Sequence, residues 1–173
     1  DGVDPDQLLK NADLALYRSK LDGRGVFRFF EPQMDAKMQA RRSLELDLRS
    51  ALPNKEFEVY YQPFVNLKTN EVSGFEALLR WNHPTRGAVA PSDFIMLAEE
   101  IGIIGAIGAL VLKQACAEAV KWPEDMRIAV NLSPAQFKSR TLALDVAAAI
   151  AASGLSPRRL ELEITETVML QDT

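Results

Sequence analysis

Two amphipathic helices are predicted in the first 55 residues. Asp4 and Pro5 suit the N-cap and first position of a helix, and apolar residues then recur every three or four positions until Gly23, which favours a helix end. A narrow stripe of leucines beside many charges in residues 33–52 is typical of a linker helix lying against a neighbouring domain, or of a seam between two copies. Between the helices, β-branched and aromatic residues predict a strand at 26–30.

From residue 55 onwards, strand patterns and helix patterns alternate. The first two predicted strands are close enough in sequence to pair as a hairpin, and the later ones are separated by helices. This order indicates parallel βαβ units and therefore an α/β fold. The predicted strands are 57–65, 72–81, 127–132 and 160–165, and the predicted helices are 91–101, 103–122 and 140–153.

Composition excludes several classes of protein. The 173 residues carry a formal net charge of −4, which argues against a dedicated binder of duplex nucleic acid. The single cysteine, Cys116, excludes an intrachain disulfide and is expected to be a core residue. With His83 as the one imidazole, expected to be structural, a zinc site is implausible, and a metal would need oxygen ligands.

The chain shows no sign of a membrane or export segment. It has no run of 18 apolar residues, so no transmembrane helix is predicted. It begins without Met on an acidic stretch unlike a signal peptide, and we interpret this start as that of a fragment.

Polar residues interrupt the predicted strands at three positions, Glu76, Asn131 and Glu163. Arg80 lies on the same side of its strand as Glu76, four residues further on. In a parallel α/β barrel, ligands bind at the carboxyl ends of the strands, where two carboxylates and an amide oxygen would suit Mg²⁺ or Mn²⁺. Arg80 would then bind a phosphate oxygen. Spacing alone leaves open that these carboxylates are solvated or salt-bridged strand residues.

Short motifs surround these residues along the chain. Residues 61–63 read Tyr-Gln-Pro and residues 76–81 read Glu-Ala-Leu-Leu-Arg-Trp. Val-Asn-Leu-Ser at 130–133 and Glu-Ile-Thr-Glu at 163–166 follow. In this order the motifs resemble the EAL family of cyclic di-GMP phosphodiesterases, and the resemblance extends over residues 56–173.

The resemblance implies a fold and a set of roles. The fold is a TIM-like (β/α)8 barrel, of which this chain would hold about the first half, since a complete barrel needs about 250 residues. Glu166 would support the site, and Leu110, where many members carry Trp, is expected to be a packing substitution. The implied metal ligands and catalytic residues are Glu76, Asn131 and Glu163, and the implied contacts to the dinucleotide are Gln62 and Arg80.

Residues 12–17 read Ala-Asp-Leu-Ala-Leu-Tyr, and Lys20 and Arg24 follow them. Through these residues the first 30 positions resemble the last helix and strand of a GGDEF domain, the diguanylate cyclase fold. The family counterparts of Lys20 and Arg24 contact nucleotide phosphates. Solvated cations favoured by the helix dipole are the alternative. Gly25 stands where the family usually has Asn, and the Gly-Gly-Asp-Glu-Phe loop is absent, so this chain is not expected to act as a cyclase.

These resemblances predict three segments: the tail of a GGDEF domain at 1–30, a linker helix at 31–55 and the first half of an EAL domain at 56–173. The expected parent is a bacterial, cytoplasmic signalling protein that hydrolyses cyclic di-GMP to linear pGpG with Mg²⁺ or Mn²⁺. Its dimerisation and membrane attachment are left open. The fragment alone is expected to be inactive, because the family's Asp-Asp pair would lie beyond Thr173. The alternatives are a catalytically silent cyclic di-GMP receptor and a parent that acts mainly as a cyclase.

Overall fold

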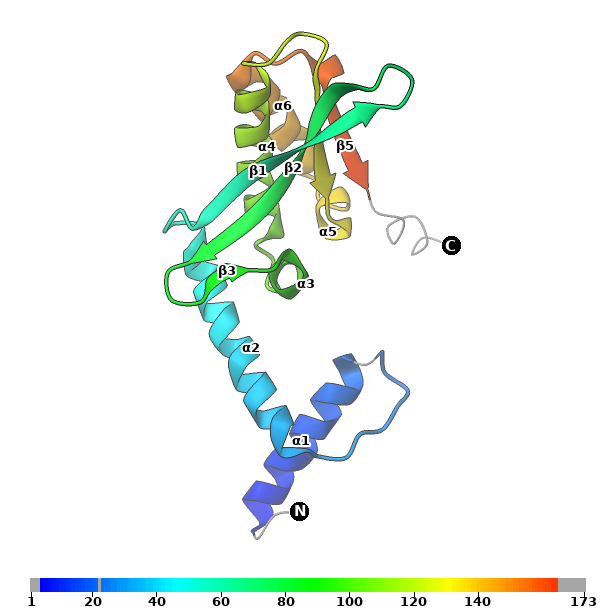
Figure 1. Ribbon diagram of the computed structural model, residues 1–173. Helices are drawn as coiled ribbons and strands as arrows, with labels where there is room; N and C mark the ends of the chain where they lie inside the picture. The colour runs from blue at the N-terminus through cyan, green and yellow to red at the C-terminus, as the bar shows by residue number, and fades with distance from the viewer. Residues whose placement is uncertain (1–3, 22, 165–173) are drawn as a thin grey trace. The chain divides into compact units, whose positions relative to one another are not determined.

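The computed structural model describes residues 4–21 and 23–164 (Figure 1). The chain divides into two compact units, residues 1–47 and 48–173, which are described separately. None of the helices within the described residues is long and apolar enough to cross a membrane.

The first unit is built on helices α1 (Pro5–Leu21) and α2 (Pro32–Ala51), and α2 continues into the second unit. The predicted N-cap of α1 is confirmed, because Oδ1 of Asp4 accepts a hydrogen bond from the backbone N–H of Gln7 at 2.8 Å. Lys10 of α1 forms an ion pair with Asp35 of α2 at 2.8 Å.

The predicted strand at 26–30 is wrong, because these residues form no regular secondary structure. Phe27 and Phe29 are 79% and 80% exposed, and their rings contact each other edge to face. A strand needs a neighbouring strand to satisfy its backbone hydrogen bonds, and no strand occurs among the described residues of this unit.

The second unit contains one sheet in the order β1-β2-β4-β5, with β3 paired to β2. Its first two strands form the predicted antiparallel hairpin, and β4 runs parallel to both β2 and β5, as the alternating pattern indicated. The short β3 was not predicted. The strands are β1 (Phe57–Asn66), β2 (Glu71–His83), β3 (Gly87–Val89), β4 (Arg127–Leu132) and β5 (Leu160–Ile164).

The three predicted helices of this unit occur in the predicted order, and each is shorter than predicted. The long helix predicted at 103–122 stops at Ala119, and the last one closes at Gly154 in a left-handed conformation with φ of 75°. One turn of helix after β4 and a 3₁₀ turn before β5 were not predicted. The helices are α3 (Pro91–Glu100), α4 (Ile104–Ala119), α5 (Pro134–Phe137), α6 (Leu142–Ser153) and η1 (Pro157–Arg159).

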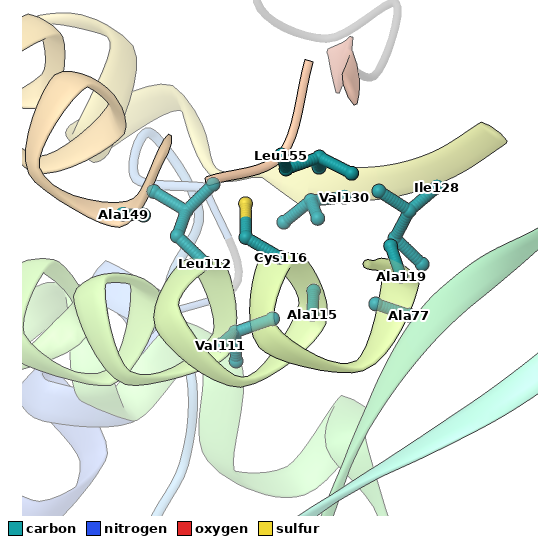
Figure 2. Packing of buried hydrophobic residues seen from close by; sticks show 10 residues of the cluster. All are labelled: Ala77, Val111, Leu112, Ala115, Cys116, Ala119, Ile128, Val130, Ala149 and Leu155. Atoms are coloured by element: carbon teal, nitrogen blue, oxygen red, sulfur yellow. The ribbon is translucent and has the colours of Figure 1, made fainter. Parts of the chain in front are cut away.

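The core lies between the sheet and helix α4, with α6 beside α4 (Figure 1). Figure 2 shows small and branched side chains of α4 meeting Ile128 and Val130 of β4. Cys116 is fully buried among them, as expected, and burial raises the pKa of its thiol. The small side chains of α4 and the branched side chains of β4 together form the core, and partly buried side chains such as Val59 and Leu79 pack against it.

Gly74 of β2 has no room for a side chain. A Cβ atom at this position would lie 2.4 Å from the carbonyl oxygen of Arg127 and 2.4 Å from Cζ of Phe64. We therefore expect Gly74→Ala to lower the free energy of unfolding by about 1–3 kcal/mol. The matched control is Gly105→Ala in α4, where an added Cβ has no neighbour within 4 Å and is expected to be neutral or slightly stabilising. Denaturant unfolding with equal midpoints for both variants would contradict this account.

Tyr61 of β1 points into the packed side of the sheet. Its ring meets Trp122 edge to face at 5.5 Å, and its hydroxyl donates to the backbone oxygen of Gln114 at 3.4 Å. Burial raises the pKa of Tyr61 from 10.0 to about 12, with smaller contributions from Glu118 and Cys116.

This shift predicts an alkaline loss of stability. Because the folded chain holds the Tyr61 proton more tightly than the unfolded chain, the stabilisation is complete below pH 10 and is lost as the pH rises toward about 12. Tyr61→Phe keeps the ring and removes the proton, so its free energy of unfolding is expected to fall less over this range. Urea unfolding of both proteins at several pH values measures the difference, and parallel pH profiles would disprove the assignment.

Candidate active site

The strand register brings the predicted site residues to the face of the sheet that is opposite to the core. Gln62 is the cross-strand partner of Glu76, and Asn131 is the partner of Glu163. Because Glu76 pairs with Ala129, which lies two residues before Asn131, all four side chains point to the same side. We call this side the polar face, and define it by Gln62, Glu76, Arg80, Asn131 and Glu163.

Glu76 and Asn131 are in direct contact although 55 positions separate them. The Nδ2 group of Asn131 donates a hydrogen bond to Oε1 of Glu76 at 2.5 Å. Val130 and Leu132, the neighbours of Asn131 in β4, are buried on the opposite side of the sheet. Their burial holds this end of β4 in place. With its nitrogen used in this way, Asn131 keeps its amide oxygen for another partner.

Two glutamates of β5 share the polar side of the sheet, and their partners distinguish them. Glu161 forms an ion pair with Arg127 at the amino-terminal end of β4. Glu163, two residues further on, lies beside Asn131 near the carboxyl ends of both strands and is exposed. The carboxylate of Glu161 is therefore neutralised within the protein, whereas Glu163 stands where ligands bind in parallel α/β proteins.

The loop after Asn131 is fixed by a capping box. Oγ of Ser133 accepts from the backbone N–H of Gln136 at 3.3 Å, and Oε1 of Gln136 accepts from the backbone N–H of Ser133 at 3.1 Å. The buried Gln136 side chain occupies the space beside Gly108 of α4, where a Cβ atom would lie 1.8 Å from Nε2. This anchoring joins the end of β4 to the core.

Arg80 lies on the polar face beyond Glu76 and is held on two sides. Its Nη1 donates to the backbone oxygen of Leu79 at 3.0 Å, and its Cζ lies 5.7 Å from the centre of the Tyr60 ring. Sequence reasoning did not identify Tyr60. The signal was present, because Tyr60 precedes Gln62 by two positions and so shares its side of β1.

The other predicted residues lie away from this group. Lys20 is exposed in the last turn of α1, and Arg24 is exposed in the turn that follows, with φ of 64°; both belong to the first unit. Nδ1 of His83 accepts hydrogen bonds from the backbone N–H groups of Thr85 and Arg86, so its structural role is confirmed. Glu166 lies outside the described residues.

The comparison with known proteins decides the family. A family model, the EAL domain, matches residues 45–173. The chain belongs to the EAL domain family.

Two relatives from Pseudomonas aeruginosa are named for activity on cyclic di-GMP. The chain is 40% identical over 176 residues to the bifunctional diguanylate cyclase/cyclic di-GMP phosphodiesterase MucR, covering 99% of the chain and 26% of MucR. It is 38% identical over 174 residues to the cyclic di-GMP phosphodiesterase NbdA, covering 98% of the chain and 22% of NbdA. The chain thus spans about a fifth to a quarter of the length of these curated relatives.

A solved structure supports the same family. The PaMucR phosphodiesterase in complex with c-di-GMP superposes on the chain with a TM-score of 0.72 and 40% identity, over 75% of this chain and 54% of that one. The sheet and helices of residues 48–164 therefore have the fold of EAL-domain structures.

The oxygen atoms of the polar face fit the divalent cation that an EAL phosphodiesterase requires. Glu76 and Glu163 offer carboxylates, and Asn131 offers an amide oxygen beside Glu76. No group of three His, Cys, Asp or Glu side chains suited to a metal occurs within residues 4–21 and 23–164. We therefore treat Glu76, Asn131 and Glu163 as candidates for part of a ligand set, and not as a complete one.

The two glutamates of β5 give a matched test of this ligand set. We expect Glu163→Gln in the full-length protein to raise the Kd for Mn²⁺ by about tenfold or more, because it removes a charged ligand. Glu161→Gln loses only its ion pair with Arg127 and is expected to leave Mn²⁺ affinity within about twofold. Titration followed by the EPR signal of free Mn²⁺ measures both, and equal affinities would exclude Glu163 as a ligand.

Proposed function

We propose that this EAL domain belongs to a phosphodiesterase that hydrolyses cyclic di-GMP to linear pGpG. The observation that carries the proposal is the contact of Glu76 with Asn131 and the position of Glu163 beside Asn131 on the polar face. MucR and NbdA, both named for cyclic di-GMP hydrolysis, support the substrate class.

Each residue of the polar face has a chemical task in this proposal. Glu76, Asn131 and Glu163 would hold Mg²⁺ or Mn²⁺ through oxygen atoms. When bound, the ion would neutralise charge on the phosphodiester and lower the pKa of a water molecule. Arg80 binds a phosphate oxygen through its guanidinium group, and Gln62 orients the dinucleotide through its amide.

The proposal extends to the organisation of the chain. Residues 1–30 would end a GGDEF domain, residues 31–55 would link it to the EAL domain, and residues 56–173 would be the first half of a (β/α)8 barrel. Support comes from MucR, a bifunctional cyclase and phosphodiesterase that matches 99% of this chain. Lys20 and Arg24 would then be the remaining phosphate contacts of the GGDEF domain.

The test is an assay of the full-length protein with Mg²⁺ and cyclic di-GMP. Glu76→Ala is expected to lower kcat by about 100-fold or more, because losing a metal ligand removes several kcal/mol of charge stabilisation. Glu71→Ala, an exposed glutamate at the start of the same strand, serves as the control and is expected to keep wild-type turnover.

The outcomes separate the alternatives. Equal turnover by wild type and Glu76→Ala would disprove the assignment of Glu76. A wild-type protein that binds cyclic di-GMP and releases no pGpG would be a receptor instead of an enzyme.

A further inference from the structure

Tyr60 and Arg80 form a contact on the polar face that the metal ligands do not involve. In the β1–β2 ladder, Tyr60 lies opposite Leu78, so Arg80 is its diagonal neighbour. The guanidinium carbon of Arg80 lies 5.7 Å from the centre of the Tyr60 ring, within the range of a cation–π interaction.

This contact contributes little to the core. The Tyr60 side chain is 53% exposed, whereas Tyr61, its neighbour on the opposite side of β1, packs against Trp122. The ring of Tyr60 therefore serves the polar face and not the packed face.

The Arg80 side chain is restrained from two directions. The Tyr60 ring contacts its guanidinium group, and the backbone oxygen of Leu79 accepts a hydrogen bond from Nη1 at 3.0 Å. An arginine has five N–H donors, so this bond leaves most of them for an anion. A free arginine side chain pays a large entropy cost when it is fixed on a ligand, and a restrained one pays less.

We propose that Tyr60 is a positioning residue that holds the guanidinium group of Arg80 ready for a phosphate of the substrate. The inference rests on the proposed function, because the phosphate contact of Arg80 is part of it. The aromatic ring of Tyr60 makes this interaction and the hydroxyl does not, because the guanidinium carbon lies over the face of the ring.

Kinetics of the full-length protein with cyclic di-GMP and Mg²⁺ test the proposal. Tyr60→Leu is expected to raise KM about three- to fivefold and to change kcat less than about twofold, because the lost interaction orders a binding group. Tyr60→Phe keeps the ring and is expected to keep the wild-type KM. Val65→Ala, a half-exposed apolar position further along β1, is the control for general effects on the strand.

A double-mutant cycle decides whether Tyr60 acts through Arg80. If it does, Tyr60→Leu has no further effect on KM in a protein that already carries Arg80→Ala. Effects that multiply in the double variant would mean that the ring binds the substrate by itself, and this would overturn the proposal. An unchanged KM for Tyr60→Leu in an active enzyme would also overturn it and leave the proposed function intact. A wild-type protein that neither binds nor hydrolyses cyclic di-GMP would contradict both the proposed function and the role of Tyr60.

Discussion

The register of the parallel strands is the constraint on which the site depends. Glu76, Asn131 and Glu163 come from three strands, and they meet because Glu76 pairs with Ala129 and Asn131 pairs with Glu163. A shift of one residue in either ladder would turn one set of side chains to the other side of the sheet. The polar oxygens would then be buried against α4, and Val130 would be exposed, so the core and the site fix each other.

The structure also gives different surroundings to two glutamates of the same strand. Glu161 and Glu163 lie on the same side of β5, but Arg127 neutralises the first and leaves the second at the carboxyl end of the strand. The capping box after Asn131 and the absence of a side chain at Gly108 anchor that end of β4 to the core. The candidate ligands are thus positioned by neighbouring residues that are not themselves candidates.

The two units show where sequence patterns succeed and where they fail. In residues 48–164, the hairpin, the parallel strands and the main helices follow from the alternation of apolar and polar residues, because each element finds a packing partner. Residues 26–30 have an equally good strand pattern and form no strand. A strand depends on a neighbour that donates and accepts its hydrogen bonds, and residue preferences alone do not supply one.

The sequence by itself determined the types and order of the elements, the oxygen chemistry of any metal site and the motifs that place Gln62, Glu76, Arg80, Asn131 and Glu163 in the EAL family. These are local or compositional properties, so they can be read along the chain. Only the tertiary structure decided that Asn131 donates a hydrogen bond to Glu76, that Arg127 forms an ion pair with Glu161 and that Arg80 contacts the Tyr60 ring. The first two contacts join strands that helices separate in the sequence, and the third crosses the β1–β2 hairpin. All three depend on the register between strands, which local residue preferences do not specify.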